Sequence, residues 1–227
     1  MIICLQNEEE SLVKRGVFHI AVPLSVTRDC KTGEMKVSVY PSLRREAASL
    51  LRRFPGNKLF SAHAIQAAKT AFDGFLAEHG FAMGEESEDF FRLYRITRPD
   101  ESRILTTTRP FDGLKGLRNL TGYDLSAMKK YGHLAFVTVI GDAIVSVACT
   151  NAPMSGRGGM EIGVETAPGY EGRGFGTSNV AALALALKKQ GCTALYECAS
   201  KNRASVRTAE NAGGTERARN YYIVGTK

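Results

Sequence analysis

The stretch Tyr-Glu-Gly-Arg-Gly-Phe-Gly-Thr at residues 170–177 decides how the second half of this chain folds. Three glycines alternate there over five positions, between a β-like run at 160–166 and a run rich in helix formers at 178–190 that Gly191 closes. A glycine-rich turn at such a point lets the backbone approach a ligand closely, and it directs unpaired N–H groups of the helix toward that ligand. Together with the positive end of the helix dipole, these groups favour a phosphate.

Two common phosphate-binding patterns do not fit this loop. A Walker loop has a Lys directly after its second glycine, and neither Gly174 nor Gly176 is followed by Lys. A dinucleotide loop has Gly-x-Gly-x-x-Gly, but the sixth position is Thr177 counted from Gly172 and Asn179 counted from Gly174. The interpretations left open are a tight turn that binds no ligand and a pyrophosphate loop of another type.

Residues 171–176 resemble the pyrophosphate loop of the GNAT N-acetyltransferase superfamily, which is written Arg/Gln-x-x-Gly-x-Gly/Ala. Gly174 and Gly176 match both required glycines, whereas Glu171 departs from the first position. The preceding Pro168-Gly169-Tyr170 is similar to the Pro-x-Tyr that leads into this loop in the superfamily. The resemblance favours a loop that binds acyl-CoA over a bare turn.

The order of predicted elements around the loop resembles the GNAT core as well. A β-like run at 193–199 follows the helix, and Asn202-Arg203-Ala204-Ser205 opens a second helix that ends near Gly213. Upstream, two β-like runs within 133–149 predict a hairpin. The predicted fold class is therefore α/β, with a GNAT-like mixed central sheet flanked by helices in a domain of residues 102–227.

Residues 1–98 are predicted to form a separate N-terminal α+β region of unknown role, because the chain has a break near Arg98-Pro99. Its predicted elements follow from alternating and helical apolar patterns. They are strands at 17–22, 35–40 and 90–96, a helix at 42–54 capped by Ser42, and a helix at 62–79.

Composition excludes several classes of protein. The chain has five cysteines without a Cys-x-x-Cys spacing and four scattered histidines, so we expect no disulfide framework and no metal. No apolar run approaches the about 18 residues that a membrane span needs, and no signal segment is evident, so we expect no membrane partner and a cytoplasmic location. The net charge is +7, but the basic residues do not form a continuous tract, so nucleic-acid binding is not expected. A homodimer is an open alternative.

The GNAT resemblance implies that acetyl-CoA binds as a substrate. In the superfamily, the main chain of the strand before the loop holds the pantetheine arm, and the loop and the start of the last helix complete the site. The residues of this chain that match these positions are Ile162, Gly163, Val164, Gly172, Arg173, Gly174, Phe175, Gly176, Thr177, Asn202 and Ser205.

Acetyl transfer to an amine requires a group that accepts the proton of the amine. In the superfamily a Glu of the strand before the loop often does this, which implies Glu161 or Glu165, and Glu197 on the next strand is a third candidate. Glu161 is the first choice, because it lies farther from the anionic end of the cofactor than Glu165 does.

The proton donor for the departing thiolate is less well defined. The helix position where the superfamily often has Tyr is occupied by Ala209, so we expect Tyr196 to replace it, with Tyr221, Tyr222 or water as alternatives. The predicted function is an N-acyltransferase that moves an acetyl group from acetyl-CoA to a primary amine, of a small molecule or a peptide, by direct attack. The alternative is a non-catalytic acyl-CoA-binding or regulatory module with the GNAT fold.

Overall fold

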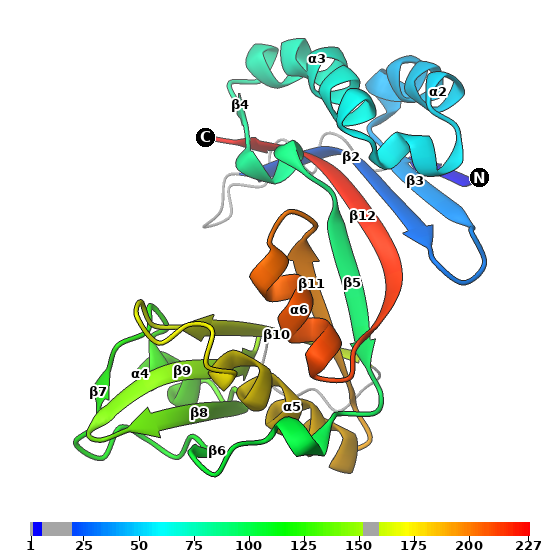
Figure 1. Cartoon of the computed structure of the whole chain (residues 1–227). Coiled ribbons are helices and arrows are strands. Elements are labelled where there is room, and N and C mark those ends of the chain that lie inside the picture. Colours follow the sequence, from blue (N-terminus) through cyan, green and yellow to red (C-terminus); the bar gives the residue numbers. More distant parts are fainter. Residues whose placement is uncertain (1, 6–19, 152–158) are drawn as a thin grey trace. The chain divides into compact units, whose positions relative to one another are not determined.

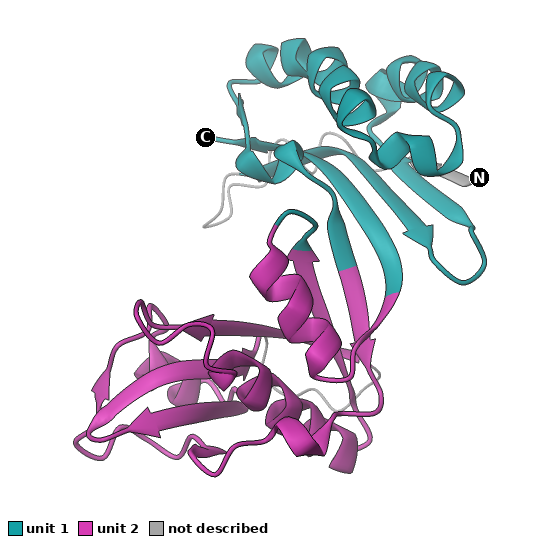
Figure 2. Cartoon of the chain, in the orientation of Figure 1, with its two compact units in different colours: residues 1–92, 199–201, 217–227 teal, residues 93–198, 202–216 magenta. Residues whose placement is uncertain are grey.

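The computed structural model describes residues 2–5, 20–151 and 159–227 (Figure 1). The chain divides into two compact units (Figure 2). Unit 1 comprises Met1–Arg92, Ala199–Lys201 and Arg217–Lys227, and unit 2 comprises Leu93–Cys198 and Asn202–Glu216. The predicted domain boundary at residues 98–102 stays a prediction. The two compact units are not continuous in sequence, because Ala199–Lys201 and Arg217–Lys227 belong to unit 1.

Strands β5 (Phe91–Ile96) and β12 (Thr215–Thr226) contribute residues to both units. The other elements of unit 1 are β1 (Ile2–Leu5), β2 (Ile20–Asp29), β3 (Met35–Val39), α2 (Arg44–Arg53), α3 (Ala62–Glu78) and β4 (Ala82–Met83). The other helices and strands of unit 2 are β6 (Thr108–Pro110), β7 (Arg118–Asn119), α4 (Leu125–Lys130), β8 (Ala135–Ile140), β9 (Ala143–Thr150), β10 (Gly159–Thr166), α5 (Phe175–Lys189), α6 (Arg203–Asn211) and β11 (Thr193–Ala199), whose last residue belongs to unit 1.

Unit 1 is built on a sheet with the strand order β1-β3-β2-β12, and β4 pairs with β12. The β2–β3 hairpin turns at Asp29, whose Oδ1 accepts hydrogen bonds from the N–H groups of Lys31 and Thr32, both at 2.7 Å. Apolar side chains of this sheet, including Leu24, Val26 and Val37, are buried together with those of α2 and α3. The predicted N-terminal α+β extension is therefore confirmed.

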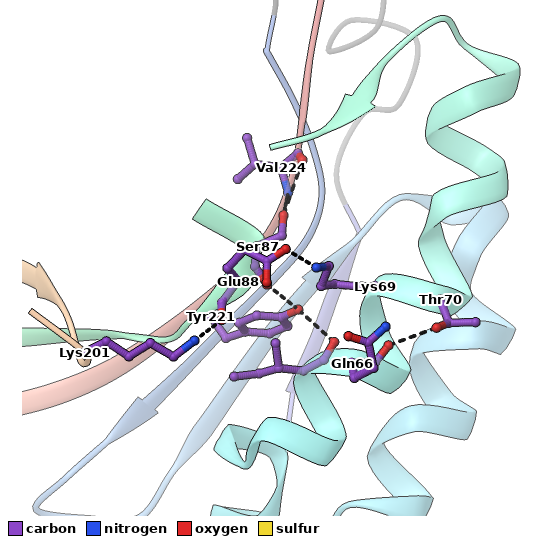
Figure 3. Close-up of polar contacts among 9 residues, drawn as sticks. Gln66, Lys69, Thr70, Ser87, Glu88, Lys201, Tyr221 and Val224 are labelled. Carbon is purple, nitrogen blue, oxygen red and sulfur yellow. Dashed lines mark hydrogen bonds and ion pairs between the residues drawn. The ribbon is translucent and has the colours of Figure 1, made fainter. Parts of the chain in front are cut away.

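Buried polar contacts attach β12 to the rest of unit 1 (Figure 3). The Tyr221 hydroxyl lies 3.4 Å from the Ile65 carbonyl oxygen on α3 and 3.3 Å from the Ser87 carbonyl oxygen. Ser87 lies in the 3-10 turn Glu85–Glu88, and its Oγ accepts from Val224 N–H at 2.8 Å. Burial raises the pKa of Tyr221 far above its usual range, so this hydroxyl remains a hydrogen-bond donor.

Unit 2 contains a mixed sheet with the order β12-β5-β11-β10-β9-β8-β6, and β7 pairs with β9. Strands β10 and β11 are parallel, whereas β10–β9, β9–β8 and β8–β6 are antiparallel. One apolar cluster joins the sheet to α5 and α6, through residues such as Ile162, Leu183 and Val206, and a second cluster contains Leu125 of α4. The predicted mixed sheet flanked by helices is confirmed.

Two details differ from the sequence predictions. Ser42 is not a helix cap, because a 3-10 turn at Pro41–Leu43 leads into α2, which starts at Arg44 without a side-chain cap. Helix α5 starts at Phe175, three residues earlier than predicted, because Gly174 is already its N-cap. Residues 17–19 of the predicted first strand lie outside the described residues.

Replacing Tyr221 by Phe should destabilise the protein by about 1–2 kcal/mol, because the buried Ser87 carbonyl oxygen loses the hydroxyl that lies against it. Urea denaturation followed by circular dichroism measures the change. Tyr131→Phe is the control, because Tyr131 is 60% exposed and its hydroxyl reaches water. Equal stabilities of the two variants would contradict the prediction.

Candidate functional site

A cavity of about 670 Å³ lies in unit 2 where β10 ends and α5 begins. Its walls come from the glycine-rich loop, from the end of β10, from β11 and from one face of α6. The predicted site residues that line it are Val164, Glu165, Gly172, Gly174, Phe175, Gly176, Thr177, Tyr196, Asn202 and Ser205. The predicted site residues that do not line it are Glu161, Ile162, Gly163, Arg173 and Glu197.

The loop exposes main-chain N–H groups because of its backbone conformation. Gly172 and Gly174 have φ of +74° and +81°, in the left-handed region that favours glycine. The first intrahelical hydrogen bond of α5 runs from Ser178 N–H to the Gly174 carbonyl oxygen at 2.9 Å. The three preceding N–H groups, of residues 175–177, therefore have no partner within the helix and lie at its positive end.

The charged side chains of the loop fold back onto the loop itself. Glu171 Oε2 accepts a hydrogen bond from Gly169 N–H at 2.6 Å. Arg173 donates from Nη2 to the Gly169 carbonyl oxygen at 3.0 Å, and its guanidinium lies 5.3 Å from the centre of the Tyr170 ring. Glu171, which departs from the superfamily pattern, thus stabilises the turn that precedes the helix.

Strand β10 loses one neighbour halfway along its length. It pairs with β11 at residues 159–161 only, whereas its pairing with β9 continues from Ile162 to Thr166. Hydrogen bonds from Asn151 N–H to the Glu161 oxygen and from Ala167 N–H to the Val145 oxygen fix which residues of β10 face β9. By the alternation of an antiparallel ladder, the main chain of Gly163 faces β9. The Ile162 N–H still belongs to the last parallel pair, Glu161 with Leu195, so the Ile162 carbonyl oxygen and the main-chain groups of Val164 face the side that β11 has left.

A tyrosine that the sequence analysis did not identify lies against this part of β10. A Cβ atom on Gly163 would come 2.4 Å from the Tyr123 hydroxyl oxygen, so Gly163 is required by the approach of this side chain. The Cys149 thiol is close enough to Tyr123 for the two groups to affect each other's pKa. Burial raises the pKa of Cys149 to about 11 and raises that of Tyr123 even further, so both groups are protonated at neutral pH.

The three candidate bases have different surroundings. Glu165 lines the cavity, and its Oε1 accepts from Gly122 N–H at 2.7 Å. Glu161 is exposed, and its Oε1 accepts from Asn151 Nδ2 at 2.9 Å. Glu197 is half-buried on β11. Of the three, Glu165 is the carboxylate that the structure brings to the cavity wall.

The start of α6 carries a linked group of predicted site residues. Asn202 caps the helix, because its side-chain oxygen accepts from Ser205 N–H at 3.0 Å. The Ser205 hydroxyl lies 2.6 Å from the Tyr196 hydroxyl, and burial raises the pKa of Tyr196 to about 12. Ala209, at the position where the superfamily often has Tyr, is fully buried.

The face of α6 toward the cavity contains further residues that the sequence analysis missed. Arg207, Thr208 and Asn211 line it together with Ala204. They lie three, four and seven residues after Ala204, a spacing that places them on one face of the helix. This spacing could have identified them from the sequence. Arg207 brings a positive charge to the cavity wall.

Within the ranges that the structure describes, no group of three or more His, Cys, Asp or Glu is placed to hold a metal ion. None of the described helices is long and apolar enough to cross a membrane.

Residues 122–223 match a protein-family model described as GNAT acetyltransferase. The resemblance to the GNAT superfamily predicted from the loop is therefore confirmed, and this part of the chain is similar to the GNAT acetyltransferase family. The match includes β8 to α6, the glycine-rich loop and Tyr123. A search of curated proteins found no match.

The comparison with solved structures found matches of low sequence identity. A GNAT-family protein from Novosphingobium aromaticivorans DSM 12444 is 18% identical with a TM-score of 0.47, over 61% of this chain and 65% of that protein. A GCN5-related N-acetyltransferase-like protein from Streptococcus suis 89/1591 is 20% identical with a TM-score of 0.47, over 70% of this chain and 69% of that protein. The chain thus spans just under two thirds of the length of the first of these proteins.

Replacing Gly163 by Ala should destabilise the protein by about 1–3 kcal/mol, because the new Cβ overlaps the Tyr123 hydroxyl. Gly176→Ala is the matched control, since a Cβ there would meet its nearest atoms, on Thr166 and Val164, at 3.4–3.5 Å, which is an ordinary contact. Thermal denaturation of both variants measures the difference.

A double variant tests the cause of the Gly163 effect. Tyr123→Phe removes the overlapping oxygen, so Gly163→Ala should cost less in that background than in the wild type. An equal cost in both backgrounds would show that Tyr123 is not what requires glycine at this position.

Proposed function

We propose that the protein is an N-acyltransferase that moves an acetyl group from acetyl-CoA to a primary amine by direct attack. The observation that carries the proposal is the cavity at which a strand with one open edge meets the start of α5. The similarity of residues 122–223 to the GNAT acetyltransferase family supports the same activity.

The residues present fit the two parts of the cofactor. The N–H groups of residues 175–177 suit the pyrophosphate, and Gly174 has no atom within 4 Å of the place its Cβ would take, which leaves room for a phosphate oxygen. The open edge at Ile162 and Val164 suits the amides of the pantetheine arm, which would bond to the strand as a further strand does. Arg207 adds a cationic group at the same cavity.

The chemistry needs an acceptor for the proton of the amine and a donor for the thiolate. The amine nitrogen bonds to the acetyl carbon as the bond from that carbon to sulfur breaks. Glu165, at the cavity wall, is the carboxylate that we assign to accept the proton from the amine, and Glu161 is the alternative. Tyr123 and Tyr196 are protonated hydroxyls in this region, and either is suited to protonate the thiolate.

Acetyl-CoA should raise the midpoint of thermal unfolding, because a ligand that binds only the folded state stabilises it by mass action. Adenosine, which lacks the pyrophosphate, should have far less effect. Differential scanning fluorimetry with acetyl-CoA, CoA, ATP, NAD and adenosine makes the comparison. Equal stabilisation by ATP or NAD would contradict the assignment of the loop to CoA.

Gly174→Glu is the matched variant for this experiment. It places a carboxylate where we expect a phosphate and keeps φ in the region unfavourable for a side chain. We expect loss of the shift caused by acetyl-CoA while the circular dichroism spectrum is retained. A folded variant that still binds acetyl-CoA would refute the position of the pyrophosphate.

Replacing Glu165 by Gln should lower turnover by roughly 10²–10⁴-fold, because the amide keeps the shape but cannot accept the proton. Acetyl-CoA affinity should change little, and the loss should shrink at high pH, where more of the amine is already deprotonated. A pH–rate profile with one accepted amine, compared with Glu161→Gln, identifies which carboxylate acts. Profiles like the wild type for both variants would exclude β10 as the source of the base.

The same experiments separate the enzyme from a non-catalytic acyl-CoA-binding module. Stabilisation by acetyl-CoA without acetylation of any amine in a broad panel, and without thioester hydrolysis, would favour the module.

A further inference from the structure

The turn between β11 and α6 belongs to unit 1, although the residues on both sides of it belong to unit 2 (Figure 2). This turn is Ala199–Lys201, and the next residue is Asn202, which caps α6 and lines the cavity. One peptide bond therefore joins a turn that is held within unit 1 to the residue that begins one wall of the cavity.

Asp89 holds this turn through both of its carboxylate oxygens. The Ser200 hydroxyl donates to Oδ1 at 2.8 Å, and the Lys201 main-chain N–H donates to Oδ2 at 2.7 Å. The Asp89 side chain is buried, with 8% of the residue exposed. The neighbours of Asp89 add two bonds, from Ser200 N–H to the Phe90 oxygen at 2.8 Å and from Lys201 Nζ to the Glu88 oxygen at 3.0 Å.

The segment that carries Asp89 is itself fixed within unit 1 (Figure 3). Lys69 of α3 forms an ion pair with Glu88. Ser87 contacts Val224 and Tyr221 of β12 through its side chain and its main chain. Asp89 therefore projects from a segment that is attached to both a helix and a strand.

We infer that Asp89 is a positioning residue for the acyl-CoA site. Asp89 fixes Ser200 and Lys201 and thereby positions the backbone of the next residue, Asn202. Asn202 caps α6 through the Ser205 N–H, so its position sets the start of the helix. The Ser205 hydroxyl in turn contacts the Tyr196 hydroxyl. This inference rests on the proposed function and gives unit 1 a part in it. If the turn is already ordered in the free protein, binding does not include the free-energy cost of ordering it, and the affinity for the ligand is higher.

Two substitutions of Asp89 separate hydrogen bonding from other effects. Asp89→Ala removes both acceptors. Asp89→Asn keeps both contacts, since its oxygen accepts from Lys201 N–H while its NH₂ donates to the Ser200 hydroxyl. Ser87→Ala is the matched control, because it removes two buried hydrogen bonds two residues away. It leaves the turn itself untouched, and the Asp89 segment is still held by the Lys69–Glu88 ion pair and by Tyr221 on the Ser87 carbonyl oxygen.

Isothermal titration calorimetry with acetyl-CoA tests the inference. We expect about tenfold weaker binding for Asp89→Ala, as for the loss of one to two hydrogen bonds, and affinities within about threefold of the wild type for the other two variants. Wild-type affinity in Asp89→Ala would overturn the inference. Equal weakening in Asp89→Ala and Ser87→Ala would also overturn it, because a general loss of stability would then explain both.

Hydrogen exchange without ligand keeps the test independent of the proposed function. Asp89→Ala should speed exchange of the Lys201 and Ser205 amides by more than Ser87→Ala does, since these amides bond to Asp89 and to the Asn202 cap. If the wild type fails to bind acetyl-CoA, the proposed function fails, and this exchange still decides whether Asp89 fixes the start of α6. Unchanged exchange at Ser205 would overturn that role.

Discussion

Backbone N–H and C=O groups need hydrogen-bond partners, and a strand inside a sheet finds them on both of its edges. Beyond Glu161, β10 continues to pair with β9 while β11 diverges from it. The groups of Ile162 and Val164 on the open edge can then bond to water or to an extended ligand. The glycine-rich loop follows β10 in the chain and α6 follows β11, so both line the cavity beside the place where the two strands diverge.

The divergence also places groups of different chemical character together. Tyr123, Cys149 and Tyr196 are neutral because burial raises their pKa values, whereas Glu165 offers a carboxylate at the cavity wall. Acid and base chemistry at one site depends on protonated donors that lie near a group able to accept a proton. Gly163 lets the Tyr123 hydroxyl lie against β10, because a Cβ atom at this position would come 2.4 Å from the hydroxyl oxygen.

Features that depend on neighbours in the chain could be predicted from the sequence. The glycine-rich loop before α5 and the Asn202 cap are set by a few adjacent residues, so the local sequence was sufficient to predict them, although α5 starts three residues earlier than predicted. Tyr123 and Asp89 could not be found in this way, since their partners, Gly163 and Lys201, lie 40 and 112 residues away. Ser42 shows the opposite error, because a residue with good capping chemistry is bypassed when a 3-10 turn precedes the helix.

The membership of β12 in both units has a consequence for how the protein is made. Its residues Tyr221 and Ile223 are completely buried in the core that α2 and α3 form with the N-terminal strands. During synthesis, chains emerge from the ribosome at about 5–20 residues per second, and domains generally fold as units. Unit 1 is translated first, yet it lacks an interior strand until residues 217–227 emerge. The part of its core that Tyr221 and Ile223 complete therefore remains uncovered while unit 2 is being translated, and exposed apolar surface of this kind favours aggregation.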